Sequence, residues 1–387
     1  MKVLVVHNEY QQPGGEDQVF EDEIGLLREH GHRVVRYKAH NDRVSDMGRG
    51  TLAVATVWNS SSYDDLRDLV RREKPHVAHF HNTFPLVSPA AYYAVKAEGV
   101  TVIQTLHNYR LMCPNALFFR DGHVCEDCRG KFAPWPGVLH ACYRQSRAAS
   151  GVVAAMLSTH RALGTWSKQV DAYVCLTQFA RRKFIEGGFA EEKIFVKPNF
   201  VHPDPGYGEG QDGYALFVGR LAPEKGVGTL IAAWEHMGGK LPLKIVGDGP
   251  LAGWVRSAAE RLPRVEWLGR KSSTEVYDLM GRAGMLIFPS EWYETFGRVA
   301  IEAYAKGTVV IAADIGAISE LVDHGQTGRL FRPGDPEDLA RQVDQVLTDP
   351  GELSRMRQNA RARFEDEYAA ERNYEMLMGI YEAARGR

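Results

Sequence analysis

Short apolar runs alternate with longer amphipathic stretches along the chain. In the first half, runs rich in β-branched residues are followed by segments whose apolar positions repeat every three to four residues, which is typical of a parallel sheet covered by helices. The predicted strands are 2–6, 33–37, 76–80, 100–105, 172–176 and 193–197. The predicted helices lie near 17–30, 87–98, 150–168 and 178–186.

The same alternation starts again after residues 197–213, a segment rich in Pro, Gly and Asp that reads as a linker between domains. The second set of predicted strands is 214–218, 242–246, 264–268, 285–288 and 308–312. The predicted helices between them are 226–236, 251–261, 274–282 and 297–306, and a polar helical tail runs from 336 to 387.

These patterns predict an α/β fold of two Rossmann-like, doubly wound parallel sheets that face a central cleft. A chain of 387 residues is longer than one core usually serves. We expect an N-terminal domain over 1–200, a C-terminal domain over 201–370, and a last helix over 371–387 that crosses back to the first domain. Because open parallel sheets bind ligands at the carboxyl ends of their strands, the loops at those ends are the places to look for chemistry.

The composition is typical of a globular protein and says little more about function. With 44% hydrophobic residues, 25% charged residues and a formal charge of -2, the chain has no general attraction for nucleic acid. No run of eighteen apolar residues occurs and the first residues enter a strand directly, which predicts a cytoplasmic protein. Residues 150–166 are loosely amphipathic, so they either pack within a domain or make peripheral contact with the inner face of a membrane.

One loop in the second half has the chemistry of an anion site. Residues 217–230, "FVGRLAPEKGVGTL", deliver Arg220 and Lys225 next to a helix start, where backbone N–H groups and the helix dipole add to the two charges. The alternative is an ordinary turn with two surface cations. Gly247, in the "GDGP" turn, allows close approach of a ligand or simply makes the turn.

Two carboxylates stand in and before a nearly apolar helix at 291–307, "EWYETFGRVAIEAYAKG". A buried carboxylate is costly unless something hydrogen-bonds it, so Glu294 and Glu302 need partners. One hypothesis is that they grip hydroxyls on separate parts of one ligand. The other is that Glu294 complements the helix dipole and Glu302 pairs with Arg298 four residues earlier.

The first half offers its own candidates. Gly14 and Gly15 form a glycine loop, "PGGED", after the first strand; it is not the G-x-G-x-x-G pattern of dinucleotide enzymes, which counts against a dehydrogenase. His79 and His81 end the predicted strand 76–80, where a metal site is one hypothesis and a core role for His79 is another.

A segment rich in cysteine, 107–146, interrupts the first domain. It contains Cys113, Cys125, Cys128 and Cys142, with one C-x2-C pair. Four thiolates in tetrahedral array would hold a structural zinc ion, whereas buried thiols of an intracellular protein often bind nothing. A zinc site therefore stays a hypothesis with an inert alternative.

The motifs "VGRLAPEKG", "GDGP" and "ETFGRVAIE", in this order, strongly resemble the retaining glycosyltransferases of family 4, which have the GT-B architecture. The resemblance implies that Glu294 contacts the transferred sugar, Glu302 the ribose, and Arg220 and Lys225 the diphosphate. It further implies the following positions: Arg270 near the base, the amides of Phe296 and Gly297 at sugar and phosphate, Gly14 and Gly15 facing phosphate and acceptor, His107 of "TLHN" beside the donor sugar, and His81 on the acceptor side.

The resulting expectation is a retaining, metal-independent glycosyltransferase with Glu294, His107, Arg220 and Lys225 as its catalytic residues. It would move a sugar from a nucleotide diphosphate sugar, UDP before GDP, to a hydroxyl acceptor such as a lipid-linked or polysaccharide intermediate, with no cofactor required. The alternatives are a non-catalytic nucleotide-sugar-binding or regulatory protein, and an epimerase or phosphorylase on the same architecture.

Overall fold

The computed structural model describes residues 1–11, 14–210 and 212–386, and these form two compact units. The first unit comprises Met1–Phe118, Cys125–Asn199 and Asn373–Arg387, and the second comprises Phe119–Val124 and Phe200–Arg372. Pro13 of the "PGGED" loop lies outside the described residues. Each unit is described here by itself.

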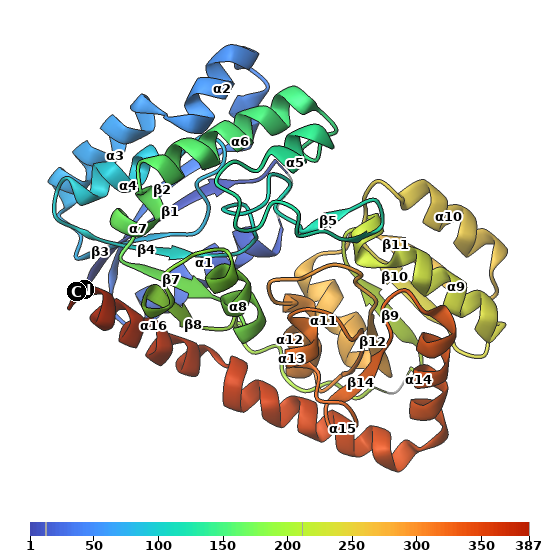
Figure 1. The fold of residues 1–387 in the computed structure, drawn as a ribbon. Coiled ribbons are helices and arrows are strands. Elements are labelled where there is room, and N and C mark those ends of the chain that lie inside the picture. The colour runs from blue at the N-terminus through green and yellow to red at the C-terminus, as the bar shows by residue number, and fades with distance from the viewer. Residues whose placement is uncertain (12–13, 211, 387) are drawn as a thin grey trace. The chain divides into compact units, whose positions relative to one another are not determined.

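The first unit is built on a six-stranded parallel sheet with the order β2-β1-β3-β4-β7-β8 (Figure 1). Its strands are β1 (Lys2–Glu9), β2 (Arg33–His40), β3 (Val77–Phe80), β4 (Thr101–Thr105), β7 (Ala172–Cys175) and β8 (Ile194–Val196). The order reverses between β1 and β3, so the loops after these two strands meet at the point where doubly wound sheets bind ligands. All six strands were predicted from their apolar runs.

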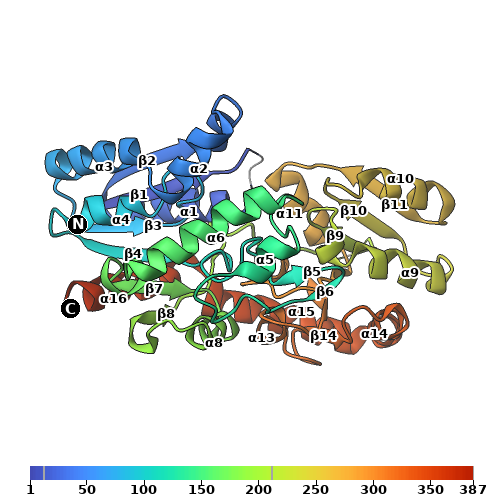
Figure 2. The same cartoon turned by 45° about the horizontal axis from the view of Figure 1, so that its top comes forward.

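Helices cover the sheet of the first unit. They are α1 (Gly15–Glu29), α2 (Arg49–Val57), α3 (Ser60–Glu73), α4 (Ala90–Lys96), α5 (Trp135–Leu139), α6 (Arg147–Ala162), α7 (Thr165–Lys168) and α8 (Gln178–Glu186), with 3-10 turns η1 (Asn41–Val44) and η2 (Glu191–Lys193). Both α2 and α5 run beside α6 (Figures 1 and 2). The single helix predicted for 150–168 is wrong, because the chain breaks at Gly164, whose φ is 68°. The sequence analysis did not identify α2 and α3.

The last helix, α16 (Ala370–Arg385), packs on the first unit from Asn373 onward. Leu377 and Tyr381 are fully buried in the same apolar cluster as Val3, Val5 and Ile24. Figure 1 shows α16 running below α1 and β8. The N-terminal core is therefore completed by the C-terminal end of the chain.

The second unit repeats the architecture, with a six-stranded parallel sheet in the order β11-β10-β9-β12-β13-β14. Its strands are β9 (Ala215–Val218), β10 (Leu243–Val246), β11 (Val265–Gly269), β12 (Met285–Phe288), β13 (Val309–Ala313) and β14 (Gly328–Phe331). The order reverses between β9 and β12. The prediction of two parallel-sheet α/β domains is thus confirmed, although β14 was not among the predicted strands.

The helices of the second unit are α9 (Val227–Met237), α10 (Ala252–Arg261), α11 (Ser273–Arg282), α12 (Arg298–Ala305), α13 (Ile318–Leu321), α14 (Pro336–Thr348) and α15 (Pro350–Arg363), with the 3-10 turn η3 (Pro223–Lys225) and the π-helical turn η4 (Phe364–Tyr368). The core on one face of the sheet includes Trp234, Ile245, Ile287, Ile311 and Val343, and the alternate strand residues, such as Leu286 and Val310, are fully buried as well. Because both faces of each strand are covered, the strands read as continuous apolar runs rather than alternating ones.

Two further observations concern the segment 107–146 and the membrane. The segment contains a two-stranded hairpin, β5 (Phe119–Arg120) and β6 (His123–Val124), which groups with the second unit. Across the described residues, every helix is too short or too polar to cross a lipid bilayer.

Candidate active site

In the second unit, the loops after β9 and β12 meet at the point where the strand order reverses. Glu294 lies in the loop after β12 and is 7% exposed. Its Oε1 accepts hydrogen bonds from Lys225 Nζ at 2.5 Å, Ser290 Oγ at 2.9 Å and Trp292 Nε1 at 2.9 Å. Three donors on one oxygen hold the carboxylate in place, so Glu294 is not a freely solvated surface charge.

The backbone ties these loops together. Glu291 N donates to Glu224 O at 2.9 Å, and Leu221 N donates to Asp248 O at 3.0 Å. Gly226, with φ of 65°, packs so closely that a Cβ there would lie 1.8 Å from Pro289 O. The loops after β9, β10 and β12 therefore form one rigid surface, on which the side chains near Lys225 are held in fixed positions.

Other predicted residues of the second unit stand at the same edge. Arg220 is exposed directly after β9. Gly247 ends β10, and its N donates to Gly269 O at 2.8 Å. Arg270 follows β11 and lies 3.7 Å from Asp248 in an exposed pair. Phe296 is buried and Gly297 is the N-cap of α12, so the first amides of that helix start beside Glu294.

Glu302 differs from Glu294 in its partner. It accepts a hydrogen bond at 2.8 Å from Arg298 Nε, in a partly buried i, i+4 pair. This is the structural alternative considered from the sequence, and it is present in the protein. An intrahelical partner does not exclude a ligand, because a carboxylate has four lone-pair positions in all.

In the first unit, a buried polar network lies where β1, β3 and β4 end. We call it the histidine network and define it as Glu23, His79, His81, His107 and Lys197. Glu23 Oε1 lies 2.7 Å from His79 Nδ1 and 3.2 Å from His81 Nε2. His81 Nδ1 lies 3.0 Å from His107 Nε2. The structure thus brings together His81 and His107, which the sequence analysis had assigned to separate roles.

The charges of this network are set by burial and by each other. Burial alone would raise the pKa of the Glu23 carboxyl, but the neighbouring His79, Lys197 and His81 outweigh it and hold that pKa well below its usual range. Burial lowers the pKa of His81 to about 4, and lowers that of His107 well below its ordinary value. Glu23 is therefore ionised at neutral pH, while His81 and His107 are uncharged.

The C-terminal helix contributes to the same network. Lys197 Nζ lies 3.3 Å from Glu23 Oε2 and donates to Asn373 Oδ1 at 2.8 Å. Tyr381 Oη lies 2.9 Å from His79 Nδ1, and Thr105 Oγ1 lies 2.7 Å from His79 Nε2. The core role expected for His79 is present, with partners from α1, β4 and α16.

The glycine loop of the first unit leads into α1. Gly14 is its N-cap residue, and Gly14 N donates to Asp17 Oδ2 at 2.7 Å. The other oxygen of Asp17 lies 2.9 Å from His7 Nε2. Glu16 accepts a hydrogen bond from Tyr10 Oη at 3.0 Å, and burial raises the pKa of its carboxyl to about 8. Gly15 is the first helical residue.

The sequence analysis did not identify several of these residues as candidates. Glu23 and Lys197 look like ordinary charges on a helix and after a strand, and no local pattern marks them. Glu16 offered a signal, because a carboxylate directly after the glycine loop stands at a helix start. Trp292 likewise flanks the Glu294 loop, but its indole N–H becomes informative only once its partner is known.

The four cysteines do not form a cluster of potential metal ligands within the described part of the chain. Among the described residues, the group of three or more His, Cys, Asp or Glu whose ligand atoms lie within 4.8 Å of one another is Glu23, His79 and His81. Cys113 Sγ donates to Asn115 Oδ1 at 2.8 Å, and burial raises the pKa of the Cys128 thiol to about 12. The arrangement gives zinc no support, and a structural zinc ion stays an untested prediction.

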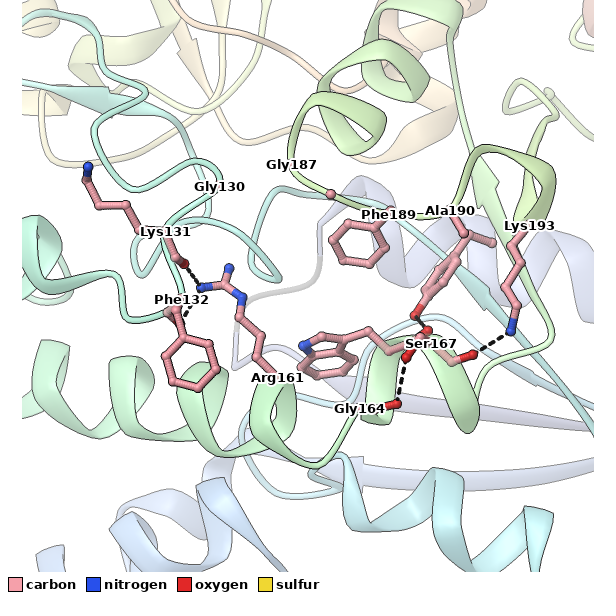
Figure 3. A pocket seen from close by; sticks show the side chains of 13 residues that line it. Gly130, Lys131, Phe132, Arg161, Gly164, Ser167, Gly187, Phe189, Ala190 and Lys193 are labelled. Carbon is pink, nitrogen blue, oxygen red and sulfur yellow. Dashed lines mark hydrogen bonds between the residues drawn. The ribbon is translucent and has the colours of Figure 1, made fainter.

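A cavity of about 360 Å³ in the first unit lies near the amino ends of β7 and β8 (Figure 3). Arg161 donates to Phe132 O at 2.9 Å and to Leu111 O at 3.0 Å, and Lys193 Nζ donates to Ser167 O at 2.7 Å. The cations that line this cavity hold neighbouring loops by their carbonyl groups. Arg161 thereby links α6 to the cysteine-rich segment, and Lys193 links the turn before β8 to α7.

Comparisons with known proteins agree with this architecture. Residues 13–205 match the profile of glycosyltransferase family 4, and residues 207–363 match that of glycosyl transferases group 1. Two parallel α/β units with ligand loops at their carboxyl edges define the GT-B class. The chain belongs to glycosyltransferase family 4.

Curated relatives cover parts of the chain. An uncharacterized glycosyltransferase of Methanocaldococcus jannaschii is 32% identical over 179 residues, which is 46% of this chain and 50% of that protein. A glycogen synthase of Mycobacterium tuberculosis is 38% identical over 159 residues, 40% of this chain and 38% of the relative. The matches therefore span half or less of these relatives' own length. A D-inositol 3-phosphate glycosyltransferase of Rhodococcus erythropolis is 23% identical over 82% of this chain and 71% of its own.

Solved structures share the fold over the full chain. The Anabaena protein HepE in complex with UDP has a TM-score of 0.71 and 17% identity, covering 99% of this chain and 100% of its own. Sucrose-phosphate synthase from Thermosynechococcus elongatus has a TM-score of 0.73 and 16% identity, covering 98% of each chain. At this identity the likeness shows the fold alone.

Proposed function

We propose that this chain is a retaining glycosyltransferase that moves a sugar from a nucleotide diphosphate sugar to a hydroxyl acceptor. The observation that carries the proposal is the contact of Lys225 with Glu294 at the strand-order reversal of the second unit. There a fixed carboxylate suits sugar hydroxyls, while the cations Lys225 and Arg220 and the first amides of α12 suit phosphate.

UDP is the preferred nucleotide, with GDP next. HepE of Anabaena has been solved with UDP and with UDP-glucose, which supports a uridine nucleotide for a chain of the same fold. Arg270, exposed next to Asp248 after β11, is the residue assigned to the base. Glu302 is assigned to the ribose, and its hydrogen bond from Arg298 restricts the orientation of its carboxylate.

The proposed chemistry exchanges one bond for another at the anomeric carbon. The bond from this carbon to the diphosphate oxygen breaks, and a bond to the acceptor oxygen forms on the same face. The acceptor's proton passes to the leaving phosphate oxygen. Lys225 and Arg220 stabilise the charge that develops on the diphosphate, so we propose that no divalent metal is needed and that transfer persists in chelator.

The acceptor is proposed to be a lipid-linked or polysaccharide intermediate. In the first unit, a groove of about 510 Å³ lies between α2 and α6. Leu52, Phe84 and Val153 give it apolar walls, and Arg49 and Arg144 add cations. Such a lining suits an acceptor with an apolar tail and an anionic group. Peripheral contact of the protein with a membrane would give access to such an acceptor.

The decisive experiment is nucleotide release from UDP-, GDP-, ADP- and TDP-sugars, compared between the unmodified protein and Glu294→Ala. We expect release from one donor, lowered at least tenfold by the substitution, with the product anomer read by NMR. Glu260→Ala, an exposed carboxylate on α10, is the matched control and should leave release unchanged. Release at the unmodified rate in Glu294→Ala would contradict the assignment, and nucleotide binding without release or transfer to any acceptor would favour a non-catalytic binding protein.

A further inference from the structure

The strongly exposed apolar side chains of the first unit gather on one layer of its helices. Among the described residues of this unit, the large apolar side chains that are 48% to 69% exposed are Val54, Phe132, Trp135, Leu139 and Leu163. Val54 lies on α2, and both Trp135 and Leu139 lie on α5. Phe132 precedes α5, and Leu163 directly follows α6. Since α2 and α5 both contact α6, we call the surface made by these five residues the α2–α5–α6 face (Figure 2).

The exposed side of α6 is also nearly free of charge. The helix buries Val153, Met156 and Leu157 against the first unit. A surface helix normally carries charged or strongly polar side chains on its opposite side. After Arg147 at the first position of α6, however, the exposed residues are Ala148, Ala155, Thr159 and Ala162. Contiguous exposed apolar surface of this kind marks a site of interaction.

The charges that accompany this face have one sign. Residues 128–170 contain six Lys and Arg residues and no Asp or Glu, although the whole chain has a formal charge of -2. Two of these cations are engaged within the protein, because Arg129 pairs with two glutamates and Arg161 donates to backbone carbonyl groups. The other four are exposed and have no carboxylate partner in the described part of the chain: Lys131, Arg144, Arg147 and Lys168. Asp42 and Asp46 precede α2, so the surplus of positive charge belongs to the segment that carries α5 and α6.

This combination of groups favours an anionic lipid surface as the occupant of the α2–α5–α6 face. Trp side chains favour the membrane–water interface, and Lys and Arg side chains contact the anionic headgroups there. A second copy of the chain would place the same cations opposite one another, which disfavours a symmetric dimer through this face. Nucleic acid would satisfy the cations, but its polar surface does not suit the aliphatic side chains of Val54, Leu139 and Leu163.

We propose that the α2–α5–α6 face docks on a membrane surface that contains anionic lipid. Phe132, Trp135 and Leu139 insert between the lipid headgroups, and the four exposed cations contact the anionic phosphate groups. The groove proposed for the acceptor adjoins this face, because Ala148 in its lining also belongs to the exposed side of α6. Resting on the proposed function, docking brings this groove to the level of the headgroups and favours a lipid-linked acceptor.

The first test measures binding of the full chain to vesicles by cosedimentation. Vesicles of phosphatidylcholine alone are compared with vesicles of an equimolar mixture of phosphatidylcholine and phosphatidylglycerol. We expect the affinity for the mixed vesicles to be at least about tenfold higher, and to fall with added salt because salt screens the charges. Absence of binding to the mixed vesicles, or equal binding to both kinds, overturns the proposal.

The second test asks which face of the protein docks. Trp135→Ser with Leu139→Ser should weaken binding to the mixed vesicles at least about tenfold, because two side chains no longer enter the interface. The matched control is Trp254→Ser with Leu347→Ser, at exposed positions of α10 and α14, and it should bind as the unmodified protein does. Because all four side chains are exposed, thermal unfolding should not change in either variant. Equal binding by the two double variants overturns the proposal.

A third variant removes charge and keeps the apolar side chains. Lys131→Gln, Arg147→Gln and Lys168→Gln together should lower the affinity for the mixed vesicles at least about tenfold, because each cation near an anionic surface contributes about fivefold. The matched control removes the same charge from exposed positions of the second unit: Lys240→Gln, Arg261→Gln and Arg355→Gln. An equal loss of affinity in the two triple variants overturns the proposal.

These experiments separate the docking surface from the proposed function. If the chain binds mixed vesicles through this face but transfers sugar from no donor, the proposed function fails and the docking surface stands. Transfer to an acceptor without any binding to vesicles overturns the docking surface alone. If Trp135→Ser with Leu139→Ser instead converts a dimer to a monomer in sedimentation velocity, and no vesicle binds, the face joins two copies of the chain and the proposal is wrong.

Discussion

The two units place their candidate residues at equivalent edges of similar sheets but in different environments. In the second unit, Glu294 is 7% exposed, but its partner Lys225 is partly exposed and the cations Arg220 and Arg270 are exposed. In the first unit, Glu23, His81 and Lys197 are sealed beneath the strand ends. Charges near solvent are available to a ligand, whereas sealed charges act on the protein itself. Substitutions of the charges near solvent in the second unit should therefore weaken ligand binding. Substitutions of the sealed charges in the first unit should lower the stability of the fold.

The largest expected effect is in the sealed network. Lys197→Met leaves the Glu23 carboxylate buried without its ammonium partner, and removal of one partner of a buried pair typically costs about 3–5 kcal/mol. Urea unfolding measures the loss. Lys240→Met breaks an exposed pair with Asp344 and should cost less than about 1 kcal/mol. Equal losses in the two variants would contradict the comparison.

The next effect is a dependence of stability on pH. The pKa of His81 is about 4 in the folded protein, below its ordinary value of 6.5. Between these values the unfolded chain binds a proton that the folded chain does not, so stability falls as pH falls, by about 3 kcal/mol for this group. His107, whose pKa is also lowered, adds a loss of the same sign.

The groups that face His81 are Glu23 from α1, His79 from β3, His107 after β4 and His7 from β1. Because the pKa of Glu23 is already depressed, its protonation adds to the loss only at lower pH. Thermal unfolding from pH 7 to pH 4 should show a smaller slope in His81→Phe than in the unmodified protein. An identical slope would mean that His81 is not the group that titrates.

In the second unit, we expect a change in loop geometry to lower both stability and nucleotide binding. Gly226→Ala forces a Cβ to 1.8 Å from Pro289 O at a positive φ, and we expect a loss of about 2 kcal/mol together with weaker nucleotide binding. Gly228→Ala, two residues into α9 with open space around it, should instead stabilise by up to about 1 kcal/mol. Differential scanning calorimetry and titration with UDP measure both. Unaltered UDP affinity in Gly226→Ala would mean that these loops do not form the binding site of UDP.

The smallest effect tests the C-terminal helix. Tyr381→Phe removes a hydroxyl 2.9 Å from His79 Nδ1 and should cost about 1 kcal/mol. Tyr374→Phe removes a less buried bond, to His32, and should cost less. If Tyr381→Phe has no effect on thermal unfolding, the hydrogen bond between Tyr381 and His79 does not contribute to the stability of the first unit.

Much of this protein was readable from local sequence. Both sheets were predicted because strands covered on both faces appear as apolar runs. Glu294 was found because it stands just before a nearly apolar helix, and Lys225 because it precedes a helix start after a strand. Where a signal was spread over a polar stretch it was missed: α3 buries only Ser62, Leu66 and Val70 of its fourteen residues. The cysteine pattern suggested zinc, but spacing along a chain does not say whether four sulfurs converge.

The sequence by itself determined the fold class, the repeated α/β organisation and the loops that bear the family motifs, because these follow from periodicity and from residues close together in the chain. Only the tertiary structure decided which distant charges meet. Glu23, His81 and Lys197 come from three separate elements, and Asn373 joins them from the far end of the chain. Their ionisation and tautomers depend on burial and on atoms a few ångströms away, which no pattern of neighbouring residues encodes.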